Sequence, residues 1–209
     1  MTGTVVGAAG VVVPAAADDG YRTSIRAVDA ATAKAMTGVS WRPGCPVAIA
    51  DLRRVKLTYW GFDEVRHRGE LIVHKSVARG VVDVFHTLYS MRFPIRKMVP
   101  VDRYGGDDNA SMAADNTSAF NCRPKTGSTT GFSVHSYGKA IDVNTVENPY
   151  VKGTVVQPPA GKAFTNRENV RPGMIRHGDR VWRAFTKHGF TWGGDWTSLK
   201  DYQHFEVPL

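Results

Sequence analysis

Four side chains in two short segments have the types and spacing needed to hold a metal ion and activate water. The segment GFSVHSYGKAIDVN carries His135 and Asp142, and the closing segment WGGDWTSLKDYQHFEV carries Asp201 and His204. A catalytic zinc site takes three protein ligands and keeps one open position. Two histidines and one aspartate supply two nitrogens and one oxygen, a set that favours zinc over magnesium or calcium. We therefore predict a zinc site formed by His135, Asp142 and His204.

Two further residues could carry out the chemistry beside this metal. Asp201 precedes His204 by three positions, close enough for its carboxylate to take a proton from water whose pKa zinc lowers toward about 7. Arg123, in a polar stretch, could clamp a substrate carboxylate or a polarised carbonyl. Taken singly, a histidine on a strand is more often structural, and Asp201 could be a turn residue. The group of four nevertheless favours a metal site.

The surrounding pattern predicts the elements that must position these residues. Apolar alternation predicts strands, helical spacing of apolar residues predicts helices, and the two kinds are segregated along the chain, which indicates an α+β fold. Ser76 is a plausible N-cap of the second helix, and Gly189 is expected to end the last one. The expected strands are 52–62, 69–75, a proline-interrupted 93–104, KAIDVN and YQHFEV; the expected helices are a patch at 24–36, 76–91 and 178–190.

Two long polar stretches, 105–130 and 150–173, interrupt this pattern. Such lengths without regular structure are uncommon in a compact domain unless the loop is functional. We expect these segments to shape the substrate site. The aromatic residue Trp192, near Asp201, could line a substrate groove, although packing beside a strand is an equal alternative.

Composition and charge narrow the class of protein. The chain has 209 residues, 42% hydrophobic and 22% charged, which is typical of one globular domain with a core. A net charge of +8 suits an anionic polymer: nucleic acid, an anionic membrane or the bacterial cell wall. The chain has no dense Lys/Arg run, and this disfavours nucleic acid.

The ends and the cysteines point to export. Residues 1–17 form an apolar, small-residue leader that resembles a secretory signal without its positive region, and a flexible leader is the alternative. The leader is too short and too broken for a membrane span. We expect an extension at 18–46 and the main domain at 47–209. Cys45 and Cys122 could pair as one disulfide, or could be two buried thiols.

The motifs also carry a resemblance to a known family. SVHSYGKAID looks like the Ser-x-His-x-x-Gly-x-Ala-x-Asp signature of the D-alanyl-D-alanine carboxypeptidase (VanY-type) zinc peptidases. The same group includes D,D-dipeptidases and L-alanyl-D-glutamate endolysins. DYQHFE is similar to the second motif, with an acidic residue three positions before the last zinc histidine, and FNCR resembles the segment that supplies an arginine.

This resemblance implies a hedgehog/DD-peptidase fold, a central antiparallel sheet flanked by helices. It implies zinc on His135, Asp142 and His204, catalysis by Asp201 and Arg123, and peptidoglycan stem peptides as substrates. The bond cut is either D-Ala-D-Ala, by a carboxypeptidase, or L-Ala-D-Glu, by an endopeptidase. Asp201 stands where several members carry glutamate, which loosens the inference about that bond.

The remaining expectations concern the partners and the rival functions. Ser133, within the first motif, is expected to line the site, with a turn hydroxyl as the alternative. We expect a secreted or wall-associated monomer that binds the anionic cell wall. A non-catalytic zinc module and a wall-anchoring protein remain the alternatives; an intact base and arginine argue against the zinc module.

Overall fold

The largest sheet forms from the first half of the chain. The computed structural model describes residues 20–125 and 131–209, so the predicted leader lies outside the described residues. Strands β2 (Leu52–Trp60) and β3 (Arg66–His74) pair antiparallel along their whole lengths, and β1 (Thr23–Ala27) adds to the free edge of β2. The sheet order is β1-β2-β3. The short helix η1 (Ile49–Asp51) leads directly into β2.

The expected helical patch at 24–36 is wrong in its first half. Residues there form β1, and the helix α1 (Ala30–Met36) begins only after Asp29. The Asp29 carboxylate accepts a hydrogen bond from the amide of Thr32, which satisfies one of the free donors at the start of α1. Pairing with β2 therefore decides the conformation of 23–27, against the helical composition of this region.

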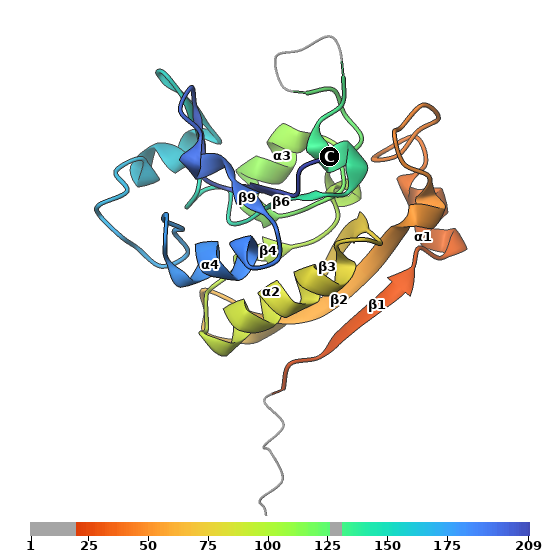
Figure 1. The fold of residues 1–209 in the computed structure, drawn as a ribbon, viewed down its shortest axis with the longest axis horizontal. Helices are drawn as coiled ribbons and strands as arrows, with labels where there is room; N and C mark the ends of the chain where they lie inside the picture. The colour runs from red at the N-terminus through yellow and green to blue at the C-terminus, as the bar shows by residue number, and fades with distance from the viewer. Residues whose placement is uncertain (1–19, 126–130) are drawn as a thin grey trace, which may run out of the picture.

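Helix α2 (Ala78–Ser90) covers one face of this sheet, and α4 (Arg180–Thr186) lies beside it (Figure 1). The helix buries Val81, Val84, Phe85 and Leu88, the apolar positions that predicted it. The N-cap is Val77, however, and not Ser76. The Ser76 hydroxyl lies 2.7 Å from Nδ1 of His74, so it is used outside the helix.

In the described residues, the remaining strands form three further small sheets beside this antiparallel one, and the expected α+β class is confirmed. One sheet has the order β6-β11-β9, a second β10-β7-β8, and a parallel pair β4-β5 forms the third. Their bounds are β4 Lys97–Met98, β5 Asn116–Thr117, β6 Ala140–Asp142, β7 Tyr150–Lys152, β8 Val155–Gln157, β9 Thr191–Trp192, β10 Lys200–Asp201 and β11 His204–Glu206.

The expected strand at 93–104 shrinks to β4 and the helix η2 (Val101–Tyr104). Pro94 and Pro100 bracket the two-residue strand, and a proline has no N–H to donate to a ladder. The polar stretches also contain structure: helix α3 (Asp108–Ala113) and β5 in the first, β7, β8 and helix η4 (Pro159–Phe164) in the second.

The core connects the large sheet to the strand that carries His204. Phe185 of α4 stacks on Phe205 of β11 with ring centroids 3.8 Å apart, and Phe85 of α2 meets Phe185 edge-on. All three rings are fully buried. Because Phe205 follows His204 directly, this aromatic packing fixes the strand on which His204 lies. Gly189 follows α4 in a left-handed conformation, near the predicted end of the helix.

Cys45 and Cys122 form a disulfide across 77 residues, as the sequence suggested. In the chain-entropy treatment, closing such a loop stabilises a fold by about 4 kcal/mol. Replacing both cysteines with alanine should therefore lower the midpoint of thermal unfolding by roughly 8–16 °C. Thermal unfolding of reduced wild type is the control, because the reduced protein lacks the crosslink but keeps both buried cysteine side chains. Equal midpoints for oxidised and reduced wild type would contradict this expectation.

A buried carboxyl group sets a second expectation for stability. Burial and a hydrogen bond to Asp115 raise the pKa of Glu147 to about 8, from an ordinary value of 4.5. The folded state therefore binds this proton more tightly than the unfolded state, and the stability that it contributes is lost as the pH rises toward 8. Arg96, 3.6 Å from Asp115, is the cation that faces this pair.

Glu147→Gln keeps a donor toward Asp115 without a titrating proton. The free energy of unfolding of this variant should exceed that of wild type increasingly as the pH rises from 5 to 8.5. Denaturant titrations across this range measure the difference. A difference that is constant with pH would contradict a raised pKa of Glu147.

No helix in the described ranges is long and apolar enough to cross a membrane.

Candidate metal centre and active site

Backbone pairing brings the three expected metal ligands together. His204 of β11 lies directly opposite Asp142 of β6 in the antiparallel register. His135 lies in the short helix η3 (Val134–Tyr137), which precedes β6. The helix begins at Ser133, whose hydroxyl accepts a hydrogen bond from the His135 amide at 3.3 Å, and ends at Gly138. The first motif thus encodes one compact helical turn followed by a strand.

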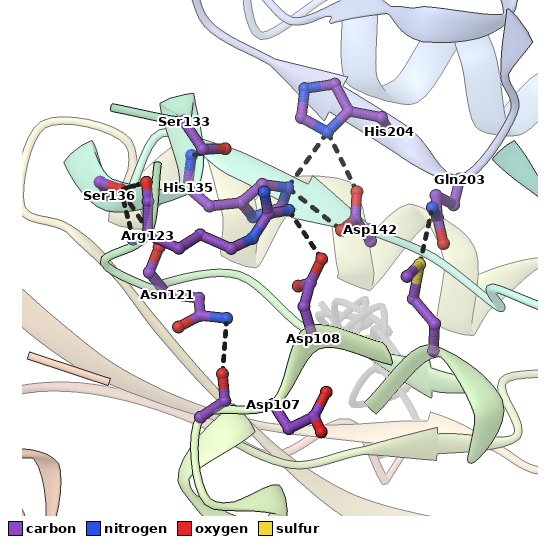
Figure 2. A network of polar contacts seen from close by, with 12 residues as sticks. Asp107, Asp108, Asn121, Arg123, Ser133, His135, Ser136, Asp142, Gln203 and His204 are labelled. Carbon is purple, nitrogen blue, oxygen red and sulfur yellow. Dashed lines mark hydrogen bonds and ion pairs between the residues drawn. The ribbon is translucent and has the colours of Figure 1, made fainter. Parts of the chain in front are cut away.

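The three side chains converge on one point (Figure 2). Nε2 of His135 lies 3.1 Å from Nδ1 of His204 and 3.1 Å from Oδ2 of Asp142. Nδ1 of His204 lies 3.0 Å from Oδ1 of Asp142. All three residues are buried.

The outer nitrogen of each ring fixes its tautomer. Nδ1 of His135 lies 2.6 Å from the carbonyl oxygen of Ala119, which can only accept, so this nitrogen carries the hydrogen. Nε2 of His204 lies 2.9 Å from a carboxylate oxygen of Glu206, so it donates there. In the neutral rings, both inner nitrogens therefore present lone pairs to each other and to Asp142. Outer partners of this kind are typical of metal-binding histidines.

A cluster of lone pairs needs a cation or an extra proton. Burial alone would lower the pKa of His204, but its hydrogen bonds to Asp142 and Glu206 raise it to about 10. Although burial opposes the shift, His135 and His204 hold the pKa of Asp142 far below its ordinary value. A divalent metal can replace such a proton, because metal binding to histidine releases protons. The donor set of two imidazole nitrogens and a carboxylate fits zinc.

Asp201 lies at the end of β10, where it pairs with Tyr150 of β7. A side chain at Gly193 would clash with the Asp201 backbone, 2.6 Å from an added Cβ, so the glycine allows helix η5 (Gly193–Asp195) to pack against the aspartate. Burial raises the pKa of Asp201 to about 6. Its Oδ1 is enclosed and has no hydrogen-bond partner within the described ranges. A carboxylate with a pKa near neutrality and a free oxygen can accept a proton.

Arg123 lies beside the helix that carries His135. Its amide donates to the Ser136 hydroxyl at 2.9 Å, and its carbonyl accepts from the Ser133 amide at 3.1 Å. Its guanidinium does not extend freely into the site: Nη2 forms an ion pair of 2.9 Å with Asp108 of α3 (Figure 2). Asp108 did not stand out in the sequence, because nothing in its neighbours signals a pairing with Arg123.

Comparison with known proteins agrees with this geometry. Residues 126–207 match the model of a family described as D-alanyl-D-alanine carboxypeptidase. The family resemblance is confirmed. The matched region contains His135, Asp142, Asp201 and His204, and Arg123 lies just before it. No solved structure matches the chain. The match supports a peptidase, and peptidases of this family are zinc-dependent in general.

Two residues expected to bind substrate have other contacts in the structure. Ser133 caps η3, as the alternative of a turn hydroxyl anticipated. Trp192 is 4% exposed; its ring packs against Phe205, and its Nε1 donates to the Tyr202 carbonyl at 2.8 Å. These are packing roles. Contact of either residue with a substrate stays a prediction.

Gly138 has a packing role beside the first motif. The residue adopts a left-handed conformation at the end of η3, and an added Cβ would lie 2.6 Å from the His74 amide nitrogen. The glycine therefore allows η3 to pack on the end of β3. Two further side chains adjoin His204: the Glu206 carboxylate, which accepts from Nε2, and Trp196, whose ring lies 5.4 Å from the His204 ring.

Proposed function

We propose that the protein is a secreted or wall-associated zinc peptidase that hydrolyses peptide bonds of peptidoglycan stem peptides. The observation that carries this proposal is the cluster of two imidazole lone pairs and one carboxylate, with the unpartnered oxygen of Asp201 nearby. The family match supports the same reading. We further propose the hedgehog/DD-peptidase fold that the resemblance implies, within the α+β class.

In this proposal each residue has one task. His135, Asp142 and His204 hold the zinc ion. When bound, zinc would polarise the scissile carbonyl and lower the pKa of water. Asp201 removes a proton from the attacking water as the C–O bond forms, and then returns it to the leaving amine as the C–N bond breaks. Arg123 stabilises negative charge on the carbonyl oxygen or holds the peptide.

The basic charge of the protein suggests how it meets the wall. A groove of about 470 Å³ between α2 and α4 is lined by three cations, Arg180 and Arg183 of α4 and Lys187 directly after it, and by one carboxylate, Asp83 of α2. Within the described ranges, none of the three cations forms an ion pair. The groove therefore carries a net positive charge, which an anionic polymer would neutralise. Pelleting with purified cell walls should weaken from 50 to 300 mM salt; salt-independent pelleting would contradict this contact.

A non-catalytic, zinc-containing wall-binding module is the second candidate. The basic groove favours binding to the wall. Asp201, by contrast, has no task in such a module, because a carboxylate oxygen that is enclosed without a hydrogen-bond partner costs stability. The two candidates differ in whether covalent bonds of the wall are cut.

Digestion of purified peptidoglycan distinguishes them. Zinc-loaded protein should release products that mass spectrometry can identify: loss of terminal D-Ala for a carboxypeptidase, or internal cleavage for an endopeptidase. Chelator should stop the release. If one equivalent of zinc binds and no product appears, the peptidase proposal fails and the binding module replaces it.

A further inference from the structure

The ion pair between Arg123 and Asp108 bears on which peptides the site accepts. An arginine can hold a substrate carboxylate through charge-assisted hydrogen bonds. Here an aspartate of the same chain already occupies Nη2 of the guanidinium, at 2.9 Å. Both side chains are partly shielded, with 21% of Arg123 and 27% of Asp108 exposed.

Contacts at both ends of helix α3 fix the position of Asp108. The Asp107 side chain caps the helix by accepting from the Ala110 amide at 3.1 Å. At the other end, the Thr145 hydroxyl donates to the Met112 carbonyl at 2.7 Å, and Nε2 of Gln203 lies 3.5 Å from the Met112 sulfur. Gln203 is the neighbour of His204. Helix α3 thus links the Arg123 side of the site to the strand that carries His204 (Figure 2).

A free substrate carboxylate at Arg123 would meet two costs. It must compete with an anion that is tethered at high effective concentration. It also brings a second negative charge next to Asp108, and like charges at short range are unfavourable. An uncharged amide at the same position carries neither cost.

We propose that Asp108 is a specificity-determining residue, which neutralises Arg123 and makes the site prefer peptides that continue as an uncharged amide beyond the scissile bond. This inference rests on the proposed peptidase function and assigns its substrate class: internal peptide bonds rather than bonds to a C-terminal residue with a free carboxylate. Removing the Asp108 charge should take away this competing anion and shift the preference toward the free acid.

The test compares two matched peptides that differ only in a C-terminal carboxylate or carboxamide after the scissile bond. Wild type should show a higher kcat/KM for the amide. Asp108→Asn should raise kcat/KM for the acid relative to the amide by roughly tenfold, the scale of a partly exposed charge pair. Asp51→Asn removes a carboxylate with the same charge that pairs with Lys75 at 2.7 Å outside the site, and should leave the preference unchanged.

A binding measurement separates this inference from the proposed function. Calorimetry of metal-free protein with the two peptides should show the same shift in relative affinity for Asp108→Asn, and the shift should vanish in Asp108→Asn/Arg123→Gln. Thermal unfolding confirms that the variants fold. If wild type prefers the acid, or if Asp108→Asn leaves the ratio unchanged, the inference is wrong. If no peptide is cleaved by any zinc-loaded protein, the proposed function fails instead.

Discussion

Replacing Asp201 with alanine should lower kcat for a stem peptide by about 10²–10⁴-fold, the usual contribution of a positioned general base. Zinc should remain bound at one equivalent, because Asp201 is not among the three converging ligands. Burial raises the pKa of Asp201 to about 6, so the carboxylate is ionised at neutral pH and can still accept a proton. Alanine removes this acceptor and leaves the ligands in place.

Mass spectrometry of a timed peptide digest measures this loss, and zinc content is measured on the same sample. Asp195→Asn is the matched control. Asp195 lies in the same segment, but its carboxylate bonds to His177 and the Trp182 indole at 2.8 and 3.0 Å. The control should keep most of its activity. An Asp201→Ala protein that cleaves at the wild-type rate would contradict the assignment of the base.

Replacing His204 with alanine should remove both zinc and activity. The imidazole supplies one of the three donor atoms and lies between Asp142 and Glu206. Glu206→Gln should have a graded effect, with zinc affinity lower by about 10–100-fold, because the carboxylate only orients the ring and strengthens its basicity. Zinc affinity should therefore fall in the order wild type, Glu206→Gln, His204→Ala.

Thermal unfolding with added zinc reports the same order independently of activity. A ligand at 1,000 times its dissociation constant stabilises the folded state by about 4 kcal/mol. Wild type should gain this stability, and His204→Ala should gain almost none. His177→Ala is the control, because His177 is largely exposed and lies outside the cluster. Equal stabilisation of wild type and His204→Ala would show that zinc binds elsewhere.

The chemistry-bearing residues could be predicted from the sequence because short segments encode them. His135 and Asp142 lie on one turn and the following strand, and Asp201 precedes His204 across a tight two-residue connection. The partners of these residues could not be predicted in the same way. Ala119 contributes only a backbone carbonyl, and Asp108 pairs with Arg123 through tertiary packing.

The strands and sheets could likewise be predicted only in part. The alternation over nine residues of β2 is long enough to predict a strand, whereas β4, β9 and β10 have two residues each and leave almost no pattern. Which sheet each strand joins depends on distant pairing partners. The strand at 23–27 illustrates this, because its edge position on β2 overrides its local composition.

The most direct test of the account is the restoration of activity by zinc. Metal-free wild type should not cleave a defined stem peptide, and added zinc should restore cleavage with a sharp break at one equivalent. The same titration of His204→Ala should restore nothing. Cleavage by the fully metal-free protein, or restoration in His204→Ala equal to wild type, would contradict a zinc peptidase centred on His135, Asp142 and His204.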